Sequence, residues 1–212
     1  MEKQVDKELY FTFDYNSQAR FISYWYQLTT IIKYKPKNIL EIGIGNKIVS
    51  DLLKKFNCEV TTVDIDKELK PDYVASIENL PFKNNSFDMV CAFEILEHLP
   101  FKKFENSLNE IKRVSRNKII FSIPDVQPYI YFCFKVTAVP RIEFQLNLPN
   151  IIKRRHKFNG QHYWELNKEG TSLRKVKSIF NNLNLELIDH FRIKENPYHH
   201  FFILQKSEDE NL

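Results

Sequence analysis

The stretch Asn38-Ile-Leu-Glu-Ile-Gly-Ile-Gly-Asn46 carries the strongest structural signal in the chain. An apolar run ends in a carboxylate and two alternate glycines, and an amphipathic segment over residues 48–56 follows. This order predicts a buried strand, a tight turn and a helix. Glycine has no Cβ, so Gly43 and Gly45 let the backbone adopt unusual angles and approach a ligand closely. The chain has only four glycines, and two in one turn favour a binding role.

Strand-like and helix-like segments alternate around this turn. Strands are predicted at residues 38–42, 59–63, 72–74, 87–93, 118–123, 185–193 and 200–205, and helices at 48–56, 104–114 and 173–183. The alternation predicts βαβ units and a parallel sheet. Asn196-Pro197 leaves only a short turn between the final two strands, so these are expected to pair antiparallel. We therefore predict a doubly wound α/β fold whose mostly parallel sheet has an antiparallel last strand.

The composition is that of one globular domain over residues 1–212. With 212 residues and 43% hydrophobic content the chain can bury a real core, and a net charge of +4 is too small to indicate nucleic acid. Three widely spaced cysteines favour reduced core residues and a cytoplasmic protein. We find no apolar signal region and no run long enough to span a bilayer. Residues 1–36 are expected to be an N-terminal helical segment, and residues 126–170 an insertion or lid.

A carboxylate at the end of the second predicted strand extends the binding signal. Asp64 follows the turn by roughly 20 residues, where a carboxylate can accept hydrogen bonds from ribose hydroxyls. A dinucleotide site would need a third glycine, and Ile48 stands in that place. Glu41 would repel phosphate but suits a cation. These features favour S-adenosylmethionine, which has an ammonium, a sulfonium and no phosphate. The structural alternative is that Glu41 caps a loop and Asp64 sits in an exposed turn.

Six short segments between Asn38 and Asp125 form an ordered series. They are Ile39-Leu-Glu-Ile-Gly-Ile-Gly45, Val63-Asp64, Glu78-Asn-Leu-Pro-Phe82, Ser86-Phe-Asp-Met-Val90, Glu94-Ile-Leu-Glu-His-Leu-Pro100 and Ile119-Ile-Phe-Ser-Ile-Pro124. In order and spacing the series resembles the class I S-adenosylmethionine-dependent methyltransferases of the type 11 group. The resemblance implies a Rossmann-like methyltransferase fold with a seven-stranded sheet.

The resemblance also implies a role for each matching position. Gly43 and Gly45 would line the methionine end of the cofactor, Glu41 would position its ammonium, Asp64 would hold the ribose and Ile65 would pack against the adenine. Ser76 and Ile77 fall where the family reads the adenine edge, and Phe93 and Glu94 lie beside the expected sulfonium. The chain departs from the family at two positions, because Lys47 replaces the usual third glycine and Ser76 replaces a frequent Asp.

Methyl transfer needs little side-chain chemistry. It is an in-line displacement with a neutral leaving group, so the enzyme mostly aligns the reactants and excludes water. A base is needed only if the acceptor must lose its proton early. The candidates are His98, Asp125 and His162. Local packing at a helix start is the favoured alternative for His98, and a turn role is an equal alternative for Asp125. No metal is inferred.

Three further segments could shape the acceptor site. In Asn159-Gly-Gln-His-Tyr-Trp-Glu165, an aromatic ring could stack on substrate while His162 or Glu165 handles a proton, or the loop could simply be pinned to the core. The apolar segment from Tyr129 to Leu148 is interpreted as a lid or dimer contact rather than a membrane surface. The basic run Lys153-Arg-Arg-His-Lys157 is interpreted as a solvated face.

These features predict an S-adenosylmethionine-dependent methyltransferase that acts on a small molecule or a glycan or lipid precursor and releases S-adenosylhomocysteine. Two alternatives stay open at this point: a binding module without turnover, and an RNA methyltransferase. Only the basic run supports the second, so no nucleic-acid partner is expected. A homodimer is compatible with the sequence.

Overall fold

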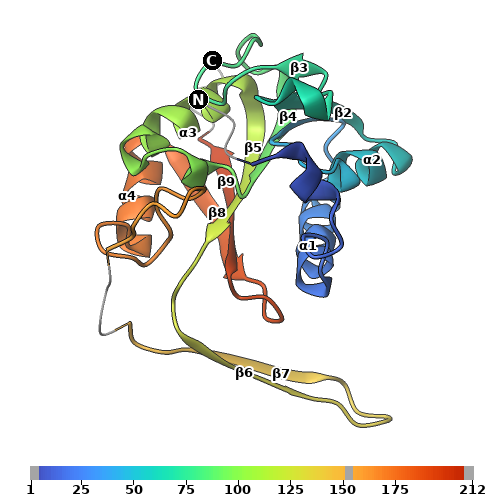
Figure 1. The fold of residues 1–212 in the computed structure, drawn as a ribbon, viewed down its shortest axis with the longest axis vertical. Helices are drawn as coiled ribbons and strands as arrows, with labels where there is room; N and C mark the ends of the chain where they lie inside the picture. The colour runs from blue at the N-terminus through green and yellow to red at the C-terminus, as the bar shows by residue number, and fades with distance from the viewer. Residues whose placement is uncertain (1–4, 151–154, 208–212) are drawn as a thin grey trace.

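The computed structural model describes residues 5–150 and 155–207. Its central element is a seven-stranded sheet in the order β3-β2-β1-β4-β5-β9-β8, with helices on both faces (Figure 1). The strands are β1 (Asn38–Ile42), β2 (Glu59–Asp64), β3 (Tyr73–Val74), β4 (Phe87–Phe93), β5 (Ser115–Pro124), β8 (Leu185–Arg192) and β9 (His199–Lys206). The α-helices are α1 (Gln18–Lys33), α2 (Ile48–Lys55), α3 (Phe104–Val114) and α4 (Leu173–Asn182), and short 3-10 helices include η1 (Lys7–Phe11) and η3 (Leu96–His98).

The strand pairing confirms the predicted doubly wound sheet. Strands β1 to β5 pair in parallel, and β9 pairs antiparallel with both β5 and β8. The last strand of the chain is therefore antiparallel, as the sequence predicts. It lies inside the sheet and not at its edge, because the short turn after β8 returns the chain alongside β8 and into the space next to β5. The edge strand is β8.

Apolar side chains on both faces of the sheet build two core layers. Val90 of β4 packs on the face covered by α3 and α4, and its neighbour Met89 packs on the face covered by α1 and α2. Successive strand residues point to opposite faces, so a strand covered on both sides reads as one continuous apolar run. This is why the central strands were predicted at nearly their observed bounds. No helix in the described part of the chain is both long enough and apolar enough to cross a membrane.

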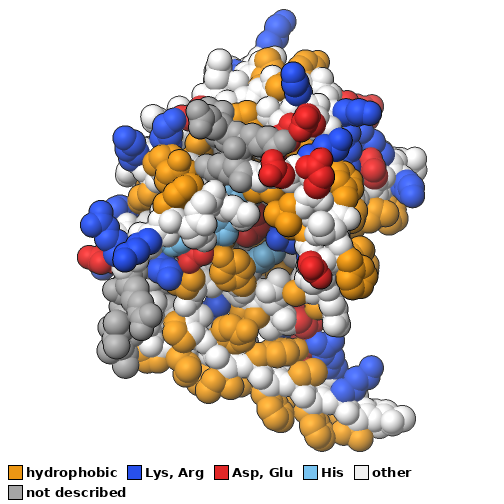
Figure 2. All heavy atoms as spheres, viewed as in Figure 1, with side chains coloured by type: hydrophobic (Ala, Val, Ile, Leu, Met, Phe, Trp, Pro, Cys, Tyr) orange, Lys and Arg blue, Asp and Glu red, His pale blue; other side chains and the backbone are white. Residues whose placement is uncertain are grey.

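A separate two-stranded hairpin, β6 (Tyr129–Phe134) and β7 (Ile142–Asn147), extends along one side of the molecule (Figure 1). The sequence predicted an irregular segment there. Its register pairs Phe132 with Phe144, so one face carries only apolar side chains: Ile130, Phe132, Phe134, Ile142, Phe144 and Leu146. All six are exposed, and they form a hydrophobic row in Figure 2. We call these six residues the outer face of the hairpin.

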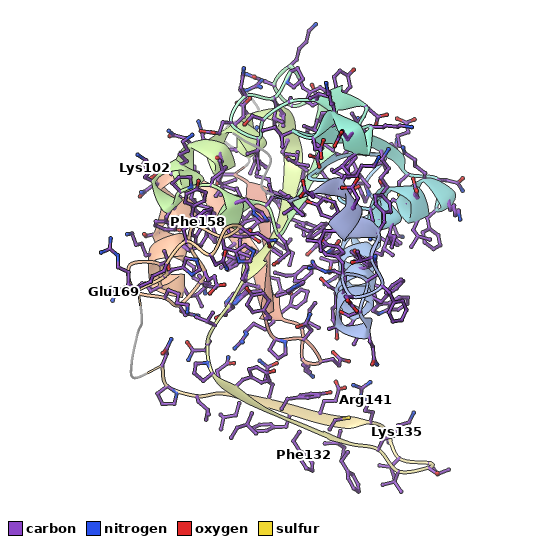
Figure 3. All side chains as sticks on the ribbon, viewed as in Figure 1. Lys102, Phe132, Lys135, Arg141, Phe158 and Glu169 are labelled. Carbon is purple, nitrogen blue, oxygen red and sulfur yellow. The ribbon has the colours of Figure 1, made fainter. Side chains whose placement is uncertain are left out.

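The opposite face of the hairpin is tied to the body by polar contacts. Arg192 of β8 donates a hydrogen bond to the Asn147 side chain at 3.0 Å, and Arg141 bonds Glu195 at 3.0 Å. The side chain of Arg141 points toward the body and that of Phe132 points away from it (Figure 3). The hairpin therefore turns the face that makes these polar contacts inward and its uniformly apolar face outward, the reverse of a core strand.

Candidate cofactor and acceptor site

The glycine turn after β1 is held against the ends of β2 and β4. The Gly43 N–H donates to the Val63 carbonyl at 2.8 Å. Gly43 has φ +78°, and a Cβ there would lie 2.0 Å from Cδ1 of Ile95, so a side chain has no room. Gly45 also has positive φ, +48°, and faces the ring of Tyr10. The left-handed backbone therefore favours glycine at both positions, and at Gly43 the close approach of Ile95 favours it further.

A cavity of about 250 Å³ opens beside this turn, at the carboxyl ends of β1, β2 and β4. All nine predicted cofactor residues line it: Glu41, Gly43, Gly45, Asp64, Ile65, Ser76, Ile77, Phe93 and Glu94. Two of the three candidate bases, His98 and His162, line it too. The switch point of the strand order lies between β1 and β4, which is where open α/β sheets bind ligands.

The N-terminal segment covers the cavity, which the sequence did not predict. The cavity is lined by Leu9, Tyr10, Tyr15, Arg20, Tyr24 and Gln27 from η1, α1 and the turn between them, and also by Gln161, Tyr198 and His199. The Asn46 side chain joins this cover to the glycine turn, because its amide donates to the Tyr24 hydroxyl at 2.8 Å and to the Asn16 side chain at 2.6 Å. The aromatic, helical spacing of residues 10–34 was the available signal.

Glu41 is a buried carboxylate at the base of the cavity. Burial raises its pKa from 4.5 to about 8, although a hydrogen bond from Ser50 opposes the shift. Its Oε2 atom has no hydrogen-bond partner among the described residues. A buried carboxylate oxygen without a partner is costly, and a ligand cation would supply the missing interaction. The site therefore fits the ammonium group of S-adenosylmethionine.

Asp64 fixes the glycine turn to the end of β2. Its Oδ2 accepts the Ile44 N–H and its Oδ1 accepts the Asp66 N–H, both at 2.9 Å. Burial raises the pKa of Asp64, and these backbone donors counteract the rise. The carboxylate lines the cavity with its orientation already set. It fits a ribose diol, since a carboxylate oxygen can accept more than one hydrogen bond.

Glu94 lies where β4 ends, in the left-handed region with φ +55°. Its Oε2 is 3.7 Å from Nε2 of His199, and Nδ1 of His199 is 2.7 Å from the Ser23 hydroxyl. Burial lowers the pKa of His199, which keeps the imidazole neutral near pH 7. Glu94, His199 and Ser23 thus form a buried polar chain between the end of β4 and α1.

His98 and His162 come together although they are far apart in the sequence. Their rings meet edge to face with centroids 5.1 Å apart. Nδ1 of His98 donates to the Gln161 carbonyl at 3.0 Å, and Nδ1 of His162 is 3.4 Å from Glu165. The hydrogen bond from His162 lowers the pKa of Glu165 to about 2, and burial lowers the pKa of His98.

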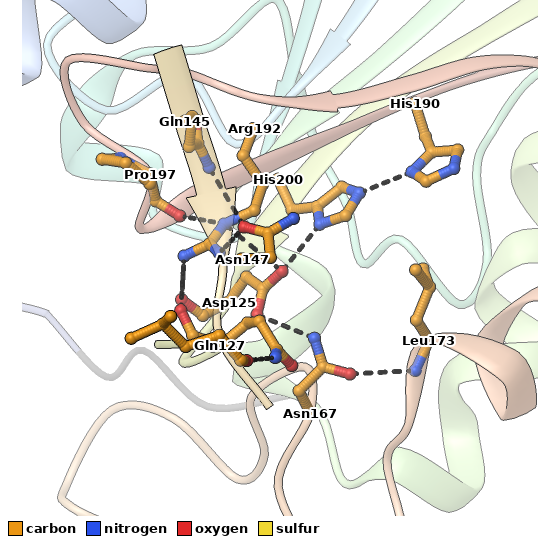
Figure 4. A network of polar contacts seen from close by, with 11 residues as sticks. Asp125, Gln127, Gln145, Asn147, Asn167, Leu173, His190, Arg192, Pro197 and His200 are labelled. Atoms are coloured by element: carbon orange, nitrogen blue, oxygen red, sulfur yellow. Dashed lines mark hydrogen bonds and ion pairs between the residues drawn. The ribbon is translucent and has the colours of Figure 1, made fainter. Parts of the chain in front are cut away.

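Asp125 lies outside the cavity, in a polar network at the end of β5 (Figure 4). Its carboxylate accepts hydrogen bonds from His200 at 2.8 Å, Asn167 at 2.9 Å and the Gln127 backbone at 2.8 Å. Burial would raise its pKa, but the His200 hydrogen bond and the Arg192 charge bring it below its ordinary value. Asp125 therefore connects the end of β5 to β8 and β9 through its polar contacts. Of the two roles expected for Asp125, the position fits a structural residue of the turn after β5 better than a residue that contacts the acceptor.

The cluster from Asn159 to Glu165 divides into core and surface. Trp164 is only 2% exposed, and its indole N–H donates to the Leu96 carbonyl at 3.2 Å. The suggestion that Trp164 stacks on substrate is therefore wrong, because the ring fills the core. Tyr163 instead packs on Phe158 at 4.4 Å, near the surface (Figure 3). Of the described residues in the range 126–170, only Gln161 and His162 line the cavity, and none of the hairpin residues does.

Comparisons with known proteins agree with this geometry. Residues 40–123 match the family model of a methyltransferase domain. An uncharacterised protein of Methanocaldococcus jannaschii is 36% identical over 87 residues, which is 38% of this chain and 36% of that protein. This chain thus matches about a third of the relative's length.

Solved structures share the fold at low sequence identity. The 1,6-didemethyltoxoflavin-N1-methyltransferase of Burkholderia thailandensis, with bound 1,6-didemethyltoxoflavin and S-adenosylhomocysteine, superposes with a TM-score of 0.59 at 14% identity, covering 90% of this chain and 78% of that one. The magnesium protoporphyrin IX methyltransferase of Synechocystis, with bound S-adenosylmethionine, gives 0.57 at 11%, covering 89% and 79%. Residues 40–123 therefore match a methyltransferase domain, and the chain shares its fold with methyltransferases solved with S-adenosylmethionine or S-adenosylhomocysteine, as the sequence predicted.

Proposed function

We propose that the protein transfers the methyl group of S-adenosylmethionine to a small-molecule acceptor, or to a glycan or lipid precursor, and releases S-adenosylhomocysteine. The observation that carries the proposal is the cavity at the switch point, in which the unpartnered Glu41 oxygen, the glycine turn and Asp64 face one space. The predicted cofactor agrees with the S-adenosylmethionine and S-adenosylhomocysteine bound in the structural neighbours.

Each wall of the cavity has a part in binding the cofactor. Glu41 holds the ammonium, Gly43 and Gly45 admit the methionine chain, and Asp64 holds the ribose. Ile65, Ser76 and Ile77 border the adenine, and Phe93 and Glu94 face the sulfonium. When bound, the cofactor supplies an electrophilic methyl carbon on a positively charged sulfur.

The remaining residues align the acceptor and exclude water. The aromatic cover from η1 and α1 closes the cavity over the cofactor, which favours direct displacement over hydrolysis. His98 and His162 lie on the acceptor side and can take a proton from an acceptor that must lose one. Residues 161–162 line the cavity, which supports a role for their loop in acceptor choice. Residues between 9 and 27 also line it, which supports a similar role for the N-terminal segment.

The nature of the partners follows from charge and fold. The net charge of +4 is modest, and the basic run lies partly outside the described residues, so we propose no nucleic-acid partner. Two structural neighbours are named for small ring compounds as substrates, which supports a small-molecule acceptor. Cys58, Cys91 and Cys133 are free thiols, in keeping with a reducing compartment such as the cytoplasm.

The test is calorimetry of the full chain with S-adenosylhomocysteine, followed by transfer of labelled methyl from S-adenosylmethionine to pooled small-molecule acceptors. We expect one site per chain and a product heavier by one methylene unit. Absence of binding would overturn the proposal. Tight binding with no transfer to any acceptor class would support the binding module instead.

A further inference from the structure

A buried carboxylate beneath the acceptor side of the cavity has no role in the function proposed above. Glu97 lies in η3 and is 0% exposed. Neither of its carboxylate oxygens has a hydrogen-bond partner among residues 5–150 and 155–207. Buried polar groups in native proteins are nearly always satisfied, so an isolated buried carboxylate indicates a missing ligand.

Two imidazoles complete a compact donor set around this carboxylate. One oxygen of Glu97, one ring nitrogen of His98 and one of His162 all lie within 4.8 Å of one another. Bonds of about 2.0–2.2 Å to zinc keep two donor atoms less than about 4.4 Å apart, so an ion would draw the three groups slightly inward. We propose that Glu97, His98 and His162 bind one divalent transition-metal ion.

The surroundings of the two histidines support metal binding. Nδ1 of His98 donates to the Gln161 carbonyl at 3.0 Å, and Nδ1 of His162 lies 3.4 Å from the Glu165 carboxylate. Metal-binding histidines are usually held in this way, with one ring nitrogen on a backbone carbonyl or carboxylate. The partners fix the orientation of both rings before any ion binds.

The local charge also favours a cation. Two further carboxylates, Glu94 and Glu165, act electrostatically on Glu97, and the Arg20 cation acts on it in the opposite sense. Two imidazoles with one carboxylate suit zinc, iron, cobalt or nickel, whereas magnesium and calcium prefer all-oxygen sites. Three protein ligands leave a coordination position open, as in catalytic zinc sites.

The open position gives the ion a use in catalysis, and this part rests on the proposed methyl transfer. His98 and His162 line the cavity, so the open position faces the acceptor side. A hydroxyl oxygen of the acceptor bound there becomes more acidic and gives its proton to water as the acceptor enters, so with the ion in place the two imidazoles act as ligands and not as bases. That oxygen then forms a bond to the methyl carbon, while the carbon–sulfur bond breaks and its electron pair stays on sulfur. The acceptor class is therefore a hydroxylated small molecule.

Cobalt titration tests the site without any activity measurement. Full-length protein freed of metal by a chelator is titrated with Co²⁺, and the visible absorption of the bound ion is followed, with Zn²⁺ as competitor. We expect one Co²⁺ per chain, displaced by Zn²⁺. Glu97→Gln and His162→Ala should each weaken binding by at least about tenfold. The matched controls Glu169→Gln and His190→Gln, which change residues outside the cavity, should bind as the wild type does.

Several outcomes overturn the proposal. They are no stoichiometric Co²⁺ in the wild type, or equal affinity in the wild type and in His162→Ala. His162 is partly exposed on a loop, so this variant stays informative if Glu97→Gln does not fold. Acetohydroxamate, a small oxygen chelator, should change the Co²⁺ spectrum, and an unchanged spectrum would overturn the acceptor role. Binding of S-adenosylhomocysteine without Co²⁺ binding refutes the metal site alone, and the reverse result refutes the methyltransferase.

Discussion

The cavity edge of the sheet and the β6–β7 hairpin solve opposite problems. At the cavity edge, polar groups are buried, and Glu41, Glu94 and Glu97 all keep oxygens that have no hydrogen-bond partner in the described part of the chain. In the hairpin, the backbone ladder is paired while six large apolar side chains face outward. The first region has buried polar atoms that a ligand could satisfy. The second is stabilised by its backbone hydrogen bonds and a few ion pairs. The buried polar atoms available to a ligand and the exposed apolar surface therefore lie in different parts of the molecule.

The largest effect is expected from the glycine turn. Gly43→Ala should lower the free energy of unfolding by about 1–2 kcal/mol because alanine is strained in the left-handed region. Overlap of the new Cβ with Ile95 should lower it by about 1–3 kcal/mol more. The control Gly170→Ala has nearly the same φ, +81° against +78°, but its Cβ would meet nothing within 4 Å. Urea unfolding should show the larger loss for Gly43→Ala, and calorimetry should show loss of S-adenosylhomocysteine binding in that variant alone. Equal losses in both variants would mean that Ile95 moves aside freely.

The next effect concerns the ribose carboxylate. Asp64→Asn should weaken S-adenosylhomocysteine binding by about 1.5–3 kcal/mol, roughly 10–150-fold, because hydrogen bonds to a charged acceptor are lost. Asp72→Asn is the matched control, since Asp72 also accepts a backbone N–H, from Thr62 at 2.8 Å, but does not line the cavity. Calorimetry of both variants measures the difference. Unchanged affinity in Asp64→Asn would remove the ribose assignment.

A smaller effect is expected from the protonation of Glu41. Its pKa of about 8 means that the free protein holds this group neutral at pH 7. Binding an ammonium requires the carboxylate, so affinity for S-adenosylhomocysteine should rise between pH 6 and pH 8, by at most about tenfold per unit. Calorimetry in buffers of different ionisation enthalpy would detect the released proton. A slope that persists in Glu41→Gln would assign the effect to another group.

The same shift has a consequence for stability. The folded state holds the Glu41 proton more tightly than the unfolded state, because the pKa rises from 4.5 to about 8 on folding. Stability from this group is therefore full below pH 4.5 and is lost as the pH rises toward 8. As the pH rises across this range, the melting temperature of the wild type should fall relative to that of Glu41→Gln. Parallel curves for the two proteins would contradict the assignment.

The smallest effect is expected from the outer face of the hairpin. The double variant Phe132→Ser and Phe144→Ser should change the unfolding free energy by no more than about 0.5 kcal/mol and leave cofactor binding intact, because both rings are already in water. Phe121→Ala is the contrast. Its ring stacks on Phe202 at 5.0 Å in the core, and its removal should lower the unfolding free energy by about 3–5 kcal/mol. A loss of similar size in the double variant would mean that the outer face is covered in solution.

The sequence predicted the sheet well because its signals are local. Residues 89–93 of β4 form a continuous apolar run, and the glycine turn and Asp64 stand at fixed places relative to the predicted strands. The hairpin was missed for a physical reason. Strand β6 carries aromatic and apolar side chains on both faces and lacks the alternation that marks a half-exposed strand, whereas β7, Ile142-Glu-Phe-Gln-Leu-Asn147, does alternate and carried a signal that was overlooked.

The acceptor side of the cavity could not be predicted in the same way. His98 and His162 were each identified as candidates, but their contact depends on how the loop after β7 packs against η3. Glu97 was overlooked because nothing in its neighbourhood of the sequence indicates complete burial. Asp125 and Trp164 were chemically suitable residues whose side chains the fold uses elsewhere. Tertiary packing, which single-sequence patterns do not encode, decided all of these positions.

Glu94 has a left-handed backbone, so this residue is expected to have opposite effects on thermal stability and on the proposed activity. A non-glycine residue at φ +55° costs roughly 1–3 kcal/mol, which Glu94→Gly would recover while deleting a carboxylate that lines the cavity and is proposed to face the sulfonium. Selection for heat resistance alone would thus accept this replacement, and selection for catalysis would reject it. A glycine at this position in a stabilised laboratory lineage would then be a sign that the proposed activity had been lost.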